Sequence, residues 1–148
     1  MGIGPETFVR FCEDSNLFSY GANCGVGPSE MVDTVLQIKK NQNIDIPIIA
    51  KGNCGIPAYQ EGKIVYSGTP KIMSRYALMA FLAGAKIIGG CCGTTAQHIR
   101  AMRNSLEKAV NSATYSAYEH FSQLGRPWQE TGKSKKSIKR PSLRKRNL

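Results

Sequence analysis

Short apolar segments alternate with helical patterns along the first 110 residues of the chain, and this alternation restricts the folds open to it. Apolar spacing predicts helices at residues 5–14, 28–38, 69–84 and 95–109, and short apolar runs predict strands at 17–20, 48–50 and 86–88. Such alternation is typical of a parallel sheet covered by helices, either doubly wound or closed into a barrel. We therefore expect an α/β fold with strands buried on both faces, and a loop over residues 51–68.

The length of the chain limits how much of such a fold it can form. It has 148 residues, of which 41% are hydrophobic, which is enough for one core. A complete barrel of eight strand–helix units takes roughly 250 residues. Since three units are recognisable, we expect residues 1–110 to form a partial barrel.

Positive charge is concentrated at the end of the chain. The formal net charge is +10, and eight lysines and arginines lie within residues 133–148, where there is no acidic residue. We expect a helical or irregular extension at 111–132 and a basic disordered tail at 133–148. Nucleic-acid binding through this tail is one alternative function, but the tail lacks the interleaved aromatic residues that such binding often uses.

The sequence has features of a cytoplasmic protein. No stretch approaches the roughly 18 apolar residues that span a bilayer, and the first residues do not resemble a signal peptide. The five cysteines are an odd number without the spacing of a secreted disulfide framework. Reduced thiols, available for metal binding or chemistry, are therefore expected.

Cysteines follow each of the three predicted strands. Asn-Cys-Gly occurs at residues 23–25 and again at 53–55, and Cys91 and Cys92 follow the third strand. Because the carboxyl ends of neighbouring parallel strands meet at one edge, these side chains should converge there. Adjacent cysteines can face one metal only if the backbone leaves strand geometry, which the surrounding glycines permit. Cys24, Cys91 and Cys92 are thus candidate zinc ligands.

Three thiolates would leave one tetrahedral position of zinc open, as in catalytic sites. A substrate sulfur could occupy that position. A free thiol has a pKa near ~8.5 and is mostly protonated at neutral pH, whereas zinc coordination deprotonates it. The expected chemistry is attack by this sulfur on an electrophilic methyl group that is held in line with it.

Structural roles compete with this interpretation. Judged by spacing alone, cysteines at three strand ends are more often small buried hydrophobic residues than metal ligands. Cys54 is expected to be a loop or packing thiol and Cys12 a core residue, whereas His98 is expected to cap or pack the last helix. That helix should present its apolar residues to the core, namely Ile99, Met102 and Leu106.

Three segments together resemble the homocysteine S-methyltransferase family, over roughly residues 8–102. They are Gly-Ala-Asn-Cys-Gly at 21–25, Lys-Gly-Asn-Cys-Gly-Ile-Pro at 51–57, and Gly-Gly-Cys-Cys-Gly-Thr-Thr at 89–95, with His-Ile at 98–99. The resemblance implies a TIM (β/α)8 barrel, of which this chain has C-terminal βα units. It also implies one Zn2+ held by Cys24, Cys91 and Cys92.

The activity implied by the resemblance is zinc-dependent transfer of a methyl group to the thiol of homocysteine, giving methionine. Asn23 and Asn53 are expected to bind the substrate. The family's N-terminal strands and most of its methyl-donor pocket have no counterpart here, so donor identity stays open among betaine, S-methylmethionine, a folate route and another methylated compound. A complementary chain or self-association is expected. The alternative is a catalytically inactive zinc-binding fragment or subunit.

Overall fold

The computed structural model describes residues 2–110 and has the α/β architecture that the sequence predicts. Three parallel strands form its main sheet in the order β1-β2-β5, with bounds β1 (Tyr20–Cys24), β2 (Ile48–Gly52) and β5 (Ala85–Gly90). The helices are α1 (Pro5–Asp14), α2 (Pro28–Asn41), α3 (Pro70–Leu82) and α4 (Ala96–Val110). The expected extension at 111–132 and tail at 133–148 lie outside the described residues.

The helices begin where their sequences favour it. Each of α1, α2 and α3 has proline in its first turn, where the missing amide proton is not needed. Thr69 caps α3, and its hydroxyl oxygen accepts a hydrogen bond from the Ile72 backbone N–H at 3.3 Å. Among the described residues, no helix is long and apolar enough to cross a membrane.

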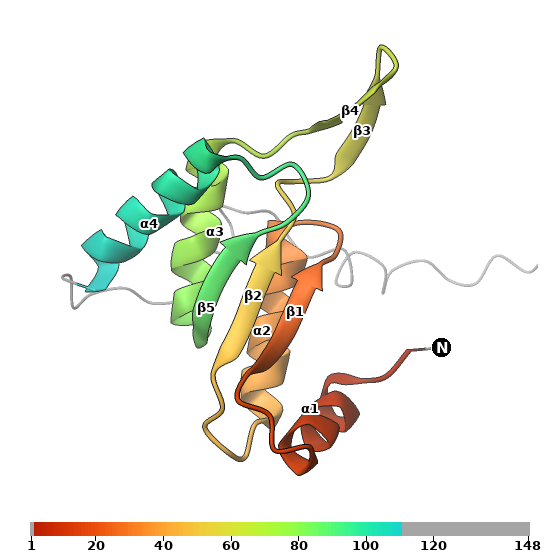
Figure 1. Ribbon diagram of the computed structural model, residues 1–148, viewed down its shortest axis with the longest axis vertical. Coiled ribbons are helices and arrows are strands. Elements are labelled where there is room, and N and C mark those ends of the chain that lie inside the picture. Colours follow the sequence, from red (N-terminus) through yellow and green to blue (C-terminus); the bar gives the residue numbers. More distant parts are fainter. Residues whose placement is uncertain (1, 111–148) are drawn as a thin grey trace, which may run out of the picture.

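The core lies between the sheet and helices α2 and α3, which are behind the strands in Figure 1. Ile48 and Ala50 of β2 are buried there. The helices contribute apolar residues at helical spacing, including Val32, Val35, Ile38, Met73, Tyr76, Ala77 and Ala80. In α4, Met102 is buried and Leu106 packs against the core as expected, but Ile99 is 46% exposed, so its predicted inward position is wrong.

The opposite face of the sheet is open, which corrects the expectation that the strands are buried on both faces. The parallel register places Gly21, Ile49 and Ile87 side by side on this face, and Ile87 is 44% exposed. No element within residues 2–110 forms a layer over it (Figure 1). Side chains along each described strand therefore alternate between a helix-covered face and an uncovered one. The three strands do not close a barrel.

The first strand begins later than the apolar run that was used to predict it. The run at 17–20 overlaps β1 only at Tyr20, while Phe18 is 85% exposed. β1 instead continues through Gly21 and Ala22. A side chain at Gly21 would overlap with the backbone of Ile49 in β2, so the small residue is what permits the close approach of the strands.

The predicted loop at 51–68 contains a β-hairpin, so that prediction is wrong. Its strands are β3 (Pro57–Gln60) and β4 (Lys63–Tyr66), which pair antiparallel and extend away from the carboxyl end of the main sheet (Figure 1). Glu61 and Gly62 join them with φ angles of 47° and 79°, the conformation of a two-residue hairpin turn. Glycine at the second turn position was the sequence signal for this hairpin.

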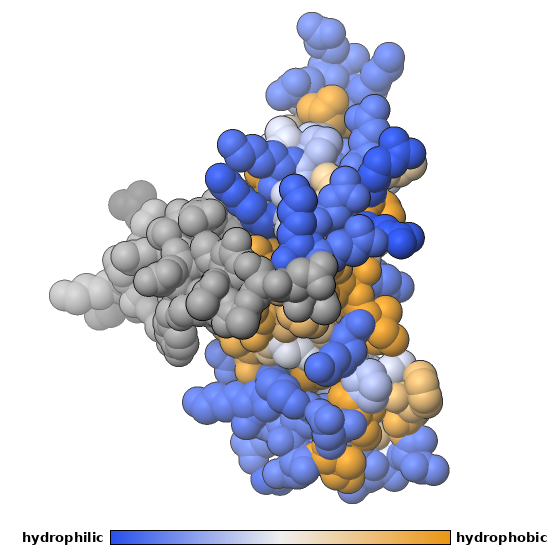
Figure 2. Space-filling model, turned by 90° about the vertical axis from the view of Figure 1, so that its left-hand side faces the viewer, coloured by the Kyte–Doolittle hydropathy of each residue, from blue (hydrophilic) through white to orange (hydrophobic). Residues whose placement is uncertain are grey.

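We expect the isolated chain to self-associate. Strands β1 and β5 are the two edges of the main sheet, with no further strand paired to either among residues 2–110, and unpaired edges readily join other chains. Apolar residues also reach the surface in the middle and lower part of the side drawn in Figure 2. Sedimentation velocity at several concentrations should show concentration-dependent oligomers. A monodisperse monomer that unfolds cooperatively would contradict this expectation.

Tyr76→Phe should lower the free energy of unfolding by about 1–3 kcal/mol. Tyr76 is completely buried, and its hydroxyl accepts a hydrogen bond of 2.9 Å from the Gly52 backbone N–H at the end of β2. The substitution would leave this buried N–H without its partner. Urea unfolding measures the loss, with Tyr59→Phe in the exposed hairpin as the control. Equal stability of the two variants would show that the buried bond is unimportant.

Candidate metal centre

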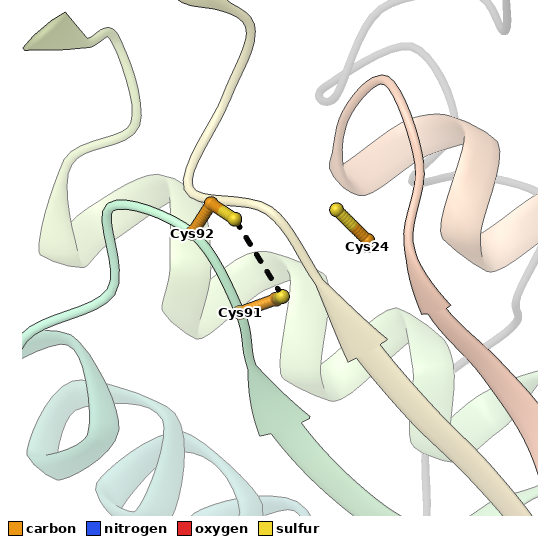
Figure 3. Close-up of side chains that lie close together, drawn as sticks. All are labelled: Cys24, Cys91 and Cys92. Carbon is orange, nitrogen blue, oxygen red and sulfur yellow. Dashed lines mark hydrogen bonds between the residues drawn. The ribbon is translucent and has the colours of Figure 1, made fainter. Parts of the chain in front are cut away.

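Three thiols meet at the carboxyl end of the sheet, as the sequence predicts. The sulfur atoms of Cys24, Cys91 and Cys92 all lie within 4.8 Å of one another. Cys24 ends β1, and the other two cysteines directly follow β5 (Figure 3). The Sγ atoms of Cys91 and Cys92 are 3.8 Å apart, which is much longer than a disulfide bond. The topology thus joins residues that are far apart in the sequence.

Backbone hydrogen bonds hold the turn that contains Cys91 and Cys92. The Cys91 N–H donates to the Gly52 carbonyl, and the Cys54 N–H donates to the Cys92 carbonyl, each at 2.9 Å. The turn is therefore tied to the end of β2 at both cysteines. Gly93 then adopts a φ of +77°, which favours glycine and takes the backbone out of strand geometry.

Cys24 is placed by an unusual backbone conformation. Its φ angle is 71°, in the left-handed region that costs an ordinary residue roughly 1–2 kcal/mol. Gly25 follows with a φ of 82°, and its carbonyl accepts a 2.7 Å hydrogen bond from the Asn53 side-chain amide. Asn53 at the end of β2 thereby holds the turn that directs Cys24 towards the other two thiols (Figure 3).

The surroundings of the cluster shift the pKa values of Cys24 and Cys92 in opposite directions. Although desolvation opposes it, hydrogen bonds from Asn53 and from the thiols of Cys91 and Cys92 lower the pKa of Cys24. Hydrogen bonds with Cys91 and Cys24, together with their negative charge, raise the pKa of Cys92. Ionisation of one thiol in the cluster is therefore favoured. Ionisation of a second thiol is opposed, because like charges at this separation repel. A cation at the centre would offset the repulsion between the thiolates.

The two asparagines predicted to bind substrate lie in different surroundings. Asn53 is 4% exposed, and its Oδ1 is buried without a hydrogen-bond partner among the described residues. A buried acceptor of this kind needs a partner, which a ligand can supply. Asn23 is exposed and is in register with Lys51, one residue before the end of each strand.

Cys54 and Cys12 lie outside the thiol cluster. The Cys54 sulfur is completely buried and donates to the Gly68 carbonyl at 3.2 Å, and burial raises its pKa. Cys12 is buried in the core, where desolvation and the nearby Glu13 carboxylate raise its pKa. The structure confirms the predicted packing role of both thiols.

His98 caps the last helix, as predicted. The Thr95 N–H donates to His98 Nδ1 at 3.0 Å, so Nδ1 is an acceptor and the ring proton is on Nε2. Nε2 then donates to the Gly68 carbonyl at 3.3 Å. Both ring nitrogens are occupied in this way, which leaves His98 outside the candidate ligand set.

Tyr66, at the end of β4, is a site residue that the sequence did not indicate. Its ring lies against Gly93, and desolvation and the neighbouring thiol of Cys92 are the main causes of its raised pKa. Because residues 51–68 were predicted to be a loop, no register was available to place this side chain. The hairpin turn in the sequence locates the end of β4, but it does not predict the contact of Tyr66 with Gly93.

The donor set fits zinc. With Zn–S bonds of roughly 2.3 Å in a tetrahedron, ligand sulfurs are about 3.8 Å apart, which equals the observed separation of Cys91 and Cys92. Three sulfurs are also one fewer than a closed structural zinc site requires. The cluster can therefore hold a soft cation and leave room for one more ligand.

Comparison with known proteins identifies the family of the chain. A family model described as homocysteine S-methyltransferase matches residues 1–106 of the chain. The chain belongs to the homocysteine S-methyltransferase family. The segment that contains all three clustered thiols lies within this match.

Two mycobacterial relatives are both described as methionine synthase. The protein from Mycobacterium leprae (strain TN) is 37% identical over 102 residues, which cover 68% of this chain and 8% of the relative. The protein from Mycobacterium tuberculosis (strain ATCC 25618 / H37Rv) is 31% identical over 101 residues, which cover 67% of this chain and 8% of the relative. The matched part of this family member thus spans only a small share of those relatives.

Gly93→Ala should lower the free energy of unfolding of this protein more than Gly25→Ala does. Both glycines have positive φ, so alanine costs roughly 1–2 kcal/mol at either position. A methyl group at Gly93 would also overlap with the Tyr66 ring, whereas nothing lies within 4 Å of one at Gly25. Urea unfolding of the two variants measures the difference. Equal losses of stability would mean that Tyr66 does not restrict the turn.

Proposed function

We propose that this chain takes part in zinc-dependent transfer of a methyl group to homocysteine, giving methionine. The observation that carries the proposal is the meeting of three thiols, contributed by two strand ends, in a member of this family. We further propose that residues 1–110 are C-terminal βα units of a homocysteine-binding (β/α)8 barrel. The parallel sheet, with helices on one face, supports this assignment.

Cys24, Cys91 and Cys92 would hold the zinc ion. Bound there, zinc would lower the pKa of the homocysteine thiol and supply a thiolate at neutral pH. In the reaction, the substrate sulfur forms a bond to the methyl carbon while the bond from that carbon to the donor breaks. The chain's contribution is to fix the three thiols and so the position of the reacting sulfur.

The open sheet face and Asn53 are suited to the rest of homocysteine. The buried Oδ1 of Asn53 can accept a hydrogen bond from the substrate's ammonium group. Asn23 and Lys51 lie in register at the carboxyl end of the strands, and Lys51 brings a positive charge that suits a carboxylate. Asn53 and Lys51 both lie at the carboxyl end of the sheet, where the thiols are. A short amino acid whose sulfur is at the centre would place its ammonium and carboxylate groups there.

The direct test is the zinc content of the purified full chain, measured by elemental analysis under reducing conditions. We expect close to one zinc per chain, and almost none in the Cys91→Ala, Cys92→Ala double variant. Cys24→Ala should also lose most of its zinc. Cys54→Ala is the matched control, since its sulfur bonds to Gly68 and is not in the cluster, and it should retain zinc.

Two results would count against the proposal. A folded wild-type chain without zinc would show that these thiols do not form the centre by themselves. Loss of zinc from Cys54→Ala equal to that from the other variants would show that the ligand assignment is wrong.

A zinc-binding subunit without activity of its own is the second candidate. It is favoured by the two unpaired edges of the described sheet and by its uncovered face. This candidate predicts zinc binding without turnover of homocysteine until a complementary chain is added. Turnover by the chain alone, with betaine, S-methylmethionine or a methylated folate, would reject it.

A further inference from the structure

The β3–β4 hairpin is exposed along almost its whole length. Tyr59 is 77% exposed, Ile64 is 64% exposed, and each residue of β3 lies at the surface. Tyr66 is the exception in the two strands, because it is partly buried where β4 returns to the sheet. The hairpin therefore meets the body of the protein through its last residue.

Tyr66 contacts the thiol centre at two places. Its ring occupies the space beside Gly93, where even a methyl group would overlap with it. Its hydroxyl forms a side-chain hydrogen bond with the thiol of Cys92. One side chain thus contacts both the turn after β5 and a sulfur that this turn carries.

The end of the hairpin is tied to the same turn. Two residues after Tyr66, the Gly68 N–H donates to the Cys54 carbonyl at 2.9 Å, and the Cys54 sulfur donates to the Gly68 carbonyl at 3.2 Å. Cys54 in turn donates its N–H to the Cys92 carbonyl at 2.9 Å. Because of these short links, Tyr66 cannot move far from Cys92 without breaking these hydrogen bonds.

We propose that Tyr66 is a positioning residue of the thiol centre: its ring holds the Cys91–Gly93 turn and its hydroxyl donates a hydrogen bond to the Cys92 sulfur. The inference rests on the proposed function. Groups that contact metal ligands from outside orient them and adjust their charge. A hydrogen bond to a ligand sulfur withdraws charge from it, so the ligand becomes a weaker nucleophile than a substrate sulfur without such a donor.

The first experiment needs no metal. The reduced, metal-free full chain is alkylated with iodoacetamide over a pH series, modification of Cys92 is followed by peptide mass spectrometry, and the rate constant of its thiolate is fitted from the range in which Tyr66 is still protonated. Tyr66→Phe keeps the ring and removes the hydroxyl, so Cys92 should react roughly fivefold faster. Tyr59→Phe makes the same change at an exposed position of the hairpin and should leave the rate unchanged. An unchanged rate in Tyr66→Phe would overturn the proposal.

The second experiment tests the ring. A chelator in excess is mixed with the zinc-loaded full chain, and metal release is timed. Tyr66→Ala should release zinc about tenfold faster or more, whereas Tyr66→Phe and Tyr59→Ala should stay close to the wild type. Far-ultraviolet circular dichroism shows whether each variant is folded. Unchanged release from folded Tyr66→Ala would overturn the proposal.

The two proposals can fail separately. If the wild-type chain holds no zinc, the proposed function fails, while the alkylation of Cys92 still decides whether Tyr66 interacts with it. If the wild type holds zinc but the Tyr66 variants behave like the Tyr59 controls, only the role of Tyr66 is rejected.

Discussion

The candidate centre depends on the carboxyl end of β2, the central strand of the sheet. Gly52 accepts a hydrogen bond from Cys91, and Cys54 donates one to the Cys92 carbonyl. Asn53, between them, holds the turn that carries Cys24. A buried tyrosine hydroxyl satisfies the Gly52 N–H from the helix side. Three consecutive residues of one strand end thus determine where all three sulfurs lie, although none of the three contributes a sulfur to the cluster.

Electrostatic repulsion explains why such a cluster suits a cation. Three sulfur atoms within 4.8 Å cannot all ionise cheaply, and the raised pKa of Cys92 reflects this. The same proximity is stabilising once positive charge is added, because thiolates are strong ligands of soft metals. The backbone strain at Cys24 is consistent with this interpretation, since strained conformations often occur where function requires a particular side-chain direction.

The hairpin and the open sheet face give the centre two different boundaries. On one side, Tyr66 and the Gly68 carbonyl connect the exposed hairpin to the thiol turn and to the capping histidine of α4. On the other side, the strands present small and apolar residues, such as Gly21 and Ile87, to uncovered space. The hairpin therefore borders the centre at Tyr66, whereas the sheet face on the other side is uncovered.

The sequence by itself determined the α/β class, the four helices and the three thiols of the site, because helical periodicity, proline positions and Asn-Cys-Gly motifs are local signals. The positions at the strand ends made Cys24, Cys91 and Cys92 candidate ligands, with Cys54 expected in a loop or packing role, and the family resemblance then strengthened that prediction. The late start of β1 and the hairpin do not follow from the same signals, because the apolar Phe18 resembles a strand residue and the polar turn at Glu61–Gly62 resembles a loop.

Only the tertiary structure decided which groups surround the sulfurs. The unpaired Oδ1 of Asn53, the left-handed backbone of Cys24 and the contact between Tyr66 and Gly93 all arise where separate strand ends meet. No periodicity along the chain encodes such meetings, because they depend on strand order and register. Composition and motifs therefore identify the atoms of the site, whereas packing determines their directions and their partners.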